Sequence, residues 1–428
     1  MDRRQIYVID PIYGAIDIPP FIADMFYEKS VRRMMFIRQL GLKAYIDFPG
    51  AIHTRYSHAL GVMHLAKKIT TLLKGKSGNG DIRAILNNTE NAIVSAGFLH
   101  DIGHGPFSHV GDYVLEKITG KSHIEMAEDI IKQKLEDYFR KSAINIDSVI
   151  AIIKGEFDYP FVHQIIDGQI DADRLDYLLR DAYFVGLKYS FDLDKFIREI
   201  KIIGEDGSPK ECELGLENNR EAIVTAEIFF IIRNSMYQLV YTIKESRIAE
   251  KMLEKALILE CEKNSELKEF FVNVEKFVNL NDEYLLEYLE QNGNSFSKNI
   301  VEGIRRKKLY EEVRRYNLSE LTDIIGKDRL PDDETANSLS EKLCEKLNLD
   351  HYKAIVDVVR IDKPKDVNIE PENKNEEPKS IRDESKIIGA IDDIITFRIY
   401  IDPNTKKEKN LNNETIDKTF KDVCGDVR

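Results

Sequence analysis

Apolar residues recur at the helical spacing of three to four positions along most of the chain between Pro19 and Ile258. Two regions alternate instead. Residues 5–18 are rich in β-branched and aromatic residues and predict short strands, and Arg198–Ile203 and Glu211–Leu216 flank a turn, GEDGSPK, and predict a β-hairpin. The pattern predicts a mainly α fold with small β-hairpins, and its helices are expected at Phe21–Gln39, Arg55–Lys74, Glu90–Asp101, Ile124–Phe139, Ile170–Phe184 and Glu221–Glu260.

Beyond this region the pattern changes twice. Residues 262–355 are highly charged with helical periodicity, so we expect an accessory helical region over 261–361 next to a main core formed by residues 1–260. Residues 362–386 are polar, contain proline and lack apolar periodicity, which indicates a linker. Ile394–Ile401 alternates like a strand, so residues 387–428 are expected to form a short β-containing segment.

Composition narrows the class of protein. No apolar run has the length of a bilayer span, and the first residues lack the apolar stretch of a signal peptide, so we expect a cytoplasmic protein without a membrane partner. The four cysteines are scattered without a CxxC pair, which is typical of a reducing compartment. A net charge of −13 argues against nucleic acid as the main partner.

Histidine clustering is the first sign of chemistry, because seven of the nine histidines lie between His53 and His123. His100 and Asp101 stand where a predicted helix ends, just before Gly103, and can bind one ion if the chain turns there. Imidazole suits transition metals, and a carboxylate adds the charge that holds a divalent ion. Upstream, His58 follows Arg55 by three residues on a predicted helix, and a guanidinium there is suited to gripping a phosphate. A lone HD pair is also typical of a helix cap.

Two predicted helices carry polar and aromatic stripes. Asp173, Tyr177 and Asp181 fall at i, i+4 and i+8 and share one face. Arg233, Tyr237 and Tyr241 repeat that spacing on a second helix. Such stripes suit the wall of a ligand pocket, but a solvated face or core packing has the same spacing, so the pattern alone leaves both interpretations open.

Three blocks, PGAIHTRYSHALGV, AGFLHDIGHGPFSH and IDADRLDYLLRD, resemble the signature blocks of the HD-domain deoxynucleoside triphosphate (dNTP) triphosphohydrolases. They are especially similar to the branch with the animal sterile-alpha-motif/HD enzymes. The resemblance runs from about Ile6 to Ala256 and implies an HD-domain helical bundle. It implies metal ligands at His58, His100, Asp101 and Asp173, a catalytic group at His104, Asp112 and His123, and substrate-binding residues at Gln39, Leu40, Arg55, Arg174, Tyr177, Asp181, Arg233, Tyr237 and Tyr241.

Some positions depart from the family pattern. Arg174 stands where a lysine is common, and Tyr237 where a histidine is often found. Tyr27, Arg32 and Met35 stand where the animal branch has the residues that bind a guanine nucleotide activator, so activation through that pocket is not expected.

The resemblance implies hydrolysis of a dNTP to deoxynucleoside and inorganic triphosphate. It implies one divalent transition metal (Fe, Mn, Co, Ni or Zn) with Mg²⁺ as a further candidate on the substrate phosphates, and a homo-oligomer, either dimer or tetramer. Two alternatives stay open. One is a two-metal HD phosphodiesterase or nucleotidase, in which His104 and His123 are metal ligands, and the other is a non-catalytic nucleotide-sensing HD protein.

Overall fold

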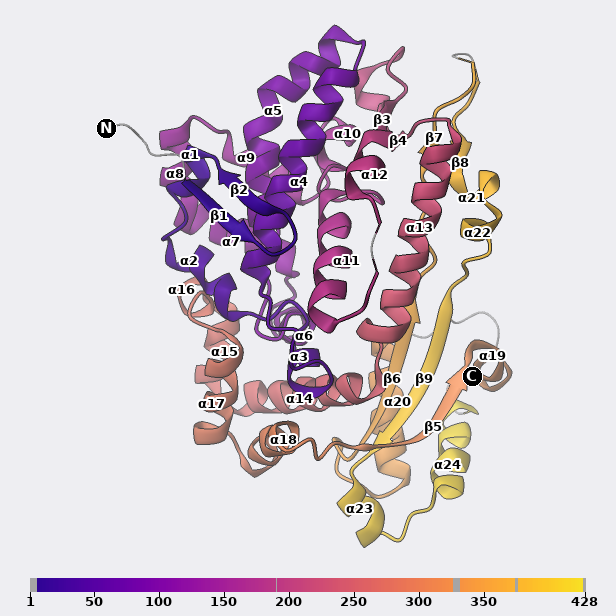
Figure 1. Cartoon of the computed structure of the whole chain (residues 1–428). Helices are drawn as coiled ribbons and strands as arrows, with labels where there is room; N and C mark the ends of the chain where they lie inside the picture. Colours follow the sequence, from indigo (N-terminus) through magenta and orange to yellow (C-terminus); the bar gives the residue numbers. More distant parts are fainter. Residues whose placement is uncertain (1–5, 190, 326–331, 374–375, 426–428) are drawn as a thin grey trace.

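The computed structural model describes residues 6–189, 191–325, 332–373 and 376–425, and its first half is a helical bundle preceded by a β-hairpin (Figure 1). Strands β1 (Ile6–Asp10) and β2 (Gly14–Ile18) pair antiparallel, as the alternation predicted. The principal helices of the bundle are α4 (Arg55–Lys76), α5 (Gly80–Leu99), α6 (His109–Thr119), α7 (His123–Ile130), α9 (Ile146–Ile153), α11 (Ala172–Val185), α13 (Arg220–Met236) and α14 (Lys244–Lys263). The predicted mainly α fold with small β-hairpins is confirmed.

Two of the long predicted helices are interrupted. The stretch 21–39 forms α1 (Pro20–Ala23), α2 (Lys29–Arg32) and the 3-10 turn η1 (Arg33–Phe36), because the chain turns to bury Arg33 against backbone carbonyls. The stretch 221–260 breaks after the π-helical turn η4 (Tyr237–Tyr241), where Thr242 leaves the helical region. By contrast, α7, the π-turn η2 (Ile131–Leu135) and α8 (Glu136–Ser142) follow one another over the helix predicted at Ile124–Phe139.

The second predicted hairpin is present and carries an addition. After α12 (Leu193–Glu199), β3 (Ile200–Ile203) pairs antiparallel with β4 (Glu213–Leu216). The segment expected to be a linker then adds β7 (Asn368–Ile369) parallel to β4, and β8 (Lys379–Ser380) antiparallel to β7. Isolated buried residues, Val367, Ile369 and Ile381, anchor it, and such sparse apolar positions leave no periodicity to detect.

The accessory region contains more than helices. Helices α15 (Ser265–Val272), α17 (Asp282–Asn292) and α18 (Ser295–Arg305) follow α14 along the lower part of the bundle in Figure 1. The helical prediction is wrong over β5 (Glu311–Asn317) and at β6 (Ala354–Ile361), which flank the predicted strand β9 (Ile394–Ile401) in one antiparallel sheet. Helices α19 (Leu318–Ile325), α20 (Asp333–Lys346) and α24 (Asn413–Gly425) accompany this sheet. Its residues form a second hydrophobic core that includes Tyr316, Phe397 and Phe420.

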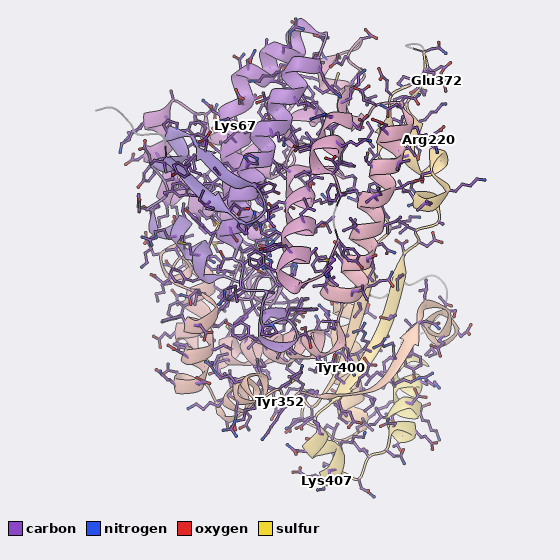
Figure 2. The ribbon with its side chains drawn as sticks, in the orientation of Figure 1. Lys67, Arg220, Tyr352, Glu372, Tyr400 and Lys407 are labelled. Atoms are coloured by element: carbon purple, nitrogen blue, oxygen red, sulfur yellow. The ribbon has the colours of Figure 1, made fainter. Side chains whose placement is uncertain are left out.

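Short helices complete the chain, at α3 (Lys43–Ile46), α10 (Pro160–His163), η3 (Pro209–Glu211), α16 (Val274–Phe277), α21 (Ile381–Glu384), α22 (Lys386–Gly389) and α23 (Pro403–Glu408). All four cysteines are buried. Figure 2 labels Tyr400 on β9, where the sheet meets the bundle. Its hydroxyl donates to Asp357 of β6, which also accepts from Arg247 of α14.

One helix bears on the expectation that no segment spans a membrane. Among the residues that the structure describes, Arg220–Tyr241 is long and apolar enough to cross a membrane, with a mean hydropathy of 1.2 in its best window. Figure 2 labels Arg220 at its start. The core helix of a soluble protein passes the same test, and 44% of this window is buried inside the protein, so the finding is weak support for a membrane span.

Candidate active site

Helix ends place the predicted metal ligands. Helix α4 begins at Arg55 because the Thr54 hydroxyl caps it, which puts His58 in its first turn. Helix α5 ends at Leu99, so His100 is its C-cap residue and Asp101 lies in the turn that follows. The Asp171 carboxylate caps α11 by accepting from the Arg174 N–H, which puts Asp173 in the first turn of that helix.

The four predicted ligands converge at one point. The Nε2 atom of His58 lies 2.9 Å from Asp173 Oδ1 and 3.6 Å from Asp101 Oδ2. The Nε2 atom of His100 lies 3.3 Å from Asp101 Oδ1 and 3.7 Å from Asp173 Oδ1. Ligand atoms of His58, His100 and Asp173 all lie within 4.8 Å of one another, as they would around a single ion.

The tautomers of the two histidines suit a metal ion. His58 donates from Nδ1 to Asp176 Oδ2 at 2.7 Å, and His100 donates from Nδ1 to the Gly97 carbonyl at 3.0 Å. Each Nε2 atom is therefore left with a lone pair. Both Nε2 atoms are buried and have no hydrogen-bond partner in the described part of the chain, an arrangement that a divalent transition metal would satisfy.

Behind His58 lies a buried chain of charges. Asp176 accepts two hydrogen bonds from Arg180, at 2.8 and 3.0 Å, and Arg180 donates a third to Asp10 at 2.7 Å. Helices α4 and α11 approach so closely here that a Cβ on Gly61 would lie 1.8 Å from the Asp176 carboxylate. Asp176 was not predicted as a site residue, although it follows Asp173 by three positions on α11 and therefore also faces α4.

The predicted catalytic residues form a second group beside the ligands. His104 Nδ1 donates to Asp112 Oδ2 at 2.7 Å, and His104 Nε2 lies 3.0 Å from Asp101 Oδ1. The His123 ring stacks on the His104 ring, with centroids 4.2 Å apart. Burial, with the neighbouring His104, lowers the pKa of His123 to about 3, so this ring is neutral near pH 7.

Both groups open onto a cavity of about 380 Å³. Seven of the nine predicted substrate-binding residues line it, namely Gln39, Leu40, Arg55, Tyr177, Asp181, Tyr237 and Tyr241. Eleven further lining residues were not predicted, and those with polar or aromatic side chains include Lys43, Phe107, Ser108, His109, Arg247 and Glu250. His109 belongs to the histidine cluster and could have been considered, but Arg247 and Glu250 lie on α14 and carry no local signal.

One wall of the cavity combines aromatic rings with a carboxylate. The Tyr241 hydroxyl donates to Asp181 Oδ2 at 2.8 Å, and His53 Nε2 donates to Asp181 Oδ1 at 2.7 Å. Tyr177 and Tyr237 pack edge-on against Tyr241, with ring centroids 6.1 and 5.1 Å away. This wall has the polar and flat apolar surfaces that a sugar ring needs.

Two predicted phosphate ligands lie outside the cavity lining. Arg174 bonds to Asp171 and to the Gly168 carbonyl. Arg233 donates to the Asp362 carbonyl at 3.1 Å, and its guanidinium lies 4.6 Å from the centre of the Tyr237 ring. Their role as phosphate ligands therefore stays a prediction that requires both side chains to change partners.

Comparison with known proteins adds to this geometry. An uncharacterized protein of Methanocaldococcus jannaschii is 33% identical over 317 residues, which cover 74% of this chain and 61% of that protein. The deoxynucleoside triphosphate triphosphohydrolase SAMHD1 of Gallus gallus is 27% identical over 406 residues, covering 82% of this chain and 63% of the relative. The chain thus spans about three fifths of the length of these curated relatives.

The fold has close counterparts as well. The crystal structure of a hypothetical protein from Aquifex aeolicus has a TM-score of 0.73 at 25% identity, over 95% of this chain and 98% of that one. Residues 55–181 match the HD domain, and residues 191–408, about half of the chain, match the HD associated region. The chain therefore belongs to the family of HD-domain proteins that carry an HD associated region.

Proposed function

We propose that this protein hydrolyses a dNTP to the deoxynucleoside and inorganic triphosphate. The observation that carries the proposal is the meeting, in one cavity, of a metal-ligand set, a paired histidine and carboxylate, and an aromatic wall with a carboxylate. The name of the Gallus gallus relative supports the choice of substrate class.

His58, His100, Asp101 and Asp173 would hold the metal ion, which supplies Lewis-acid polarisation of a phosphoryl oxygen when bound. Arg55 lines the cavity and donates to Asp101 Oδ2 at 2.8 Å, so its positive charge is fixed next to the position of the phosphates. In an acidic protein, such a local cation is what attracts a triphosphate.

His104 is the proposed general acid. Water attacks the α-phosphorus, the bond from phosphorus to the 5′-oxygen breaks, and His104 Nε2 gives its proton to that oxygen. The proton lost by the water restores His104, so the products are the deoxynucleoside and triphosphate. Asp112, hydrogen-bonded to Nδ1 at 2.7 Å, stabilises the charged imidazolium before the transfer.

The aromatic wall is the proposed site for the deoxyribose. Tyr241, held against Asp181 by its hydroxyl, places a flat ring where a 2′-hydroxyl would find no polar partner. Asp181 would accept from the 3′-hydroxyl. A site that leaves a polar group unpaired discriminates strongly against it, so ribonucleotides should react poorly.

The test is incubation with each dNTP and NTP in the presence of Mn²⁺ or Mg²⁺, with the products identified by mass. We expect deoxynucleoside and triphosphate from dNTPs, and no turnover by the double variant His100→Ala with Asp101→Ala, which should lose its metal while staying folded. Release of pyrophosphate or a nucleoside monophosphate, or equal turnover of GTP and dGTP, would contradict the proposal.

A two-metal phosphodiesterase or nucleotidase is the second candidate. His104, Asp112 and His123 offer three ligand atoms within 4.8 Å of one another, beside the first set. Metal analysis distinguishes the two functions, because one tightly bound ion per chain favours the triphosphohydrolase and two favour the alternative. The metal itself and the expected homo-oligomer are further parts of the proposal, to be tested by metal analysis and by the mass of the protein in solution.

A further inference from the structure

The loop between α5 and α6, which carries His104, has a strained backbone. Phe107 and Ser108 have φ angles of 56° and 54°, and both line the cavity. A non-glycine residue rarely adopts a positive φ angle, and this conformation persists only where its surroundings enforce it. The loop therefore needs a fixed partner.

Asp282 is that partner, and it lies in the HD associated region. It is the first residue of α17 and only 1% exposed. Its Oδ1 atom accepts from the Phe107 N–H at 2.7 Å, and its Oδ2 atom accepts from the Arg38 N–H at 2.9 Å. One carboxylate thus joins the strained loop to the segment that carries Gln39 and Leu40.

Arg33 makes a second set of contacts between this loop and the accessory helices. Its guanidinium donates to the carbonyls of Ile102 and His104 and to the carbonyl of Leu280, just before α17. It also lies 4.5 Å from the centre of the Phe277 ring. The loop is therefore tied to the accessory helices at both of its ends.

Apolar packing would be the ordinary solution at such a buried position, because desolvating a carboxylate is costly unless its hydrogen bonds compensate. One compensating N–H group belongs to Phe107, which lines the cavity. The other belongs to Arg38, which directly precedes the lining residue Gln39. The helix N-terminus on which Asp282 stands also favours its negative charge.

We propose that Asp282 is a positioning residue of the active site. By holding Phe107 and Arg38 it fixes His104 and the Gln39–Leu40 segment relative to the metal ligands. Asp282 then contributes to the reaction from the HD associated region without itself touching the substrate. The kinetic consequence rests on the proposed function, whereas the structural consequence does not.

The variant Asp282→Asn keeps the size of the side chain but offers one oxygen and an amide NH₂, which cannot accept from the second N–H. We expect the 102–108 and 37–40 segments to open more often. Losing one buried backbone hydrogen bond should speed amide hydrogen exchange there about tenfold or more. Exchange of the distal end of α17 and the melting temperature should change little.

Kinetics supply the second measurement. Since misplacement of catalytic groups by a fraction of an ångström lowers turnover, kcat with a dNTP should fall about 10- to 100-fold, with KM and metal content nearly unchanged. A merely structural role would instead lower the melting temperature and the active fraction. The matched control is Glu283→Gln, the next residue, whose exposed side chain bonds to Tyr45 on the surface and should leave exchange and kinetics as they are.

Unchanged amide hydrogen exchange of segments 102–108 and 37–40 in Asp282→Asn would overturn the proposal. An equal loss of kcat in the Glu283→Gln control would overturn it as well. If Asp282→Asn does not fold, amide hydrogen exchange of the unaltered protein tests the proposal instead. The Phe107 and Arg38 amides should then exchange as slowly as the helix cores, and rapid exchange would refute the contact. Absence of any dNTP turnover by the unaltered protein would refute the proposed function, while the exchange result would still stand.

Discussion

Replacing Asp176 by asparagine tests whether the buried charges behind His58 set the metal affinity. The Asp176 carboxylate is fully buried, accepts from His58 Nδ1 at 2.7 Å and accepts twice from Arg180. The amide can still accept from His58, but it removes the negative charge that raises the basicity of the imidazole and leaves Arg180 paired with Asp10 alone.

Two magnitudes follow from this geometry. Loss of a carboxylate behind a metal-binding histidine typically weakens metal binding about 10- to 100-fold, which corresponds to about 1.4–2.8 kcal/mol. Breaking one half of a buried ion pair typically lowers the free energy of unfolding by about 3–5 kcal/mol. Because Arg180 keeps one of its two carboxylates, we expect the lower end of that range.

The assay is a competition for the metal against a chelator, followed by metal analysis, with urea unfolding of the same samples. Asp194→Asn is the control for the loss of one aspartate charge, since its exposed side chain pairs only at the surface with Lys68 and should change neither quantity. An Asp176→Asn variant that binds metal as tightly as the unaltered protein would refute the role assigned to Asp176.

His104→Ala should lower kcat about 10²- to 10⁴-fold while metal content stays constant, and loss of a metal ion instead would favour the two-metal alternative. Tyr241→Ala should narrow the preference for dGTP over GTP, measured as the ratio of kcat/KM values, and an unchanged ratio would remove Tyr241 from sugar selection. Asp357→Asn removes the buried partner of Arg247 between the sheet and α14, so urea unfolding should show a loss of about 3 kcal/mol.

The sequence was sufficient for features that depend on local spacing. Alternation predicted the hairpins β1–β2 and β3–β4 and the strand β9, and helical periodicity predicted α4, α11 and the second half of α5. The residues proposed as metal ligands were named from the family resemblance, and each stands at a helix end or in a first turn that capping residues such as Thr54 and Asp171 define.

Periodicity failed where one pattern suits two structures. Strand β5 lies within a charged, seemingly helical region, and only pairing with β9 makes it a strand. The segment AIVDVVRI of β6 is apolar and β-branched, so the helical prediction missed a local signal for a strand. The interruption in 21–39 has a tertiary origin. Arg33 is drawn into the interior by carbonyls at Ile102 and Leu280, which no local signal reveals.

Tertiary structure alone decided how the site is held together. Asp181 is hydrogen-bonded to His53, Arg180 links Asp176 to Asp10, and Asp282 accepts from the Phe107 N–H. In each case the two acidic residues, or the acidic residue and its partner, lie more than a hundred residues apart in the chain. Sequence spacing determines which face of a helix a side chain occupies, so it can predict ligands that the chain presents locally. It carries no information on which distant carboxylate will be buried against that face, because that choice depends on the packing of the whole protein.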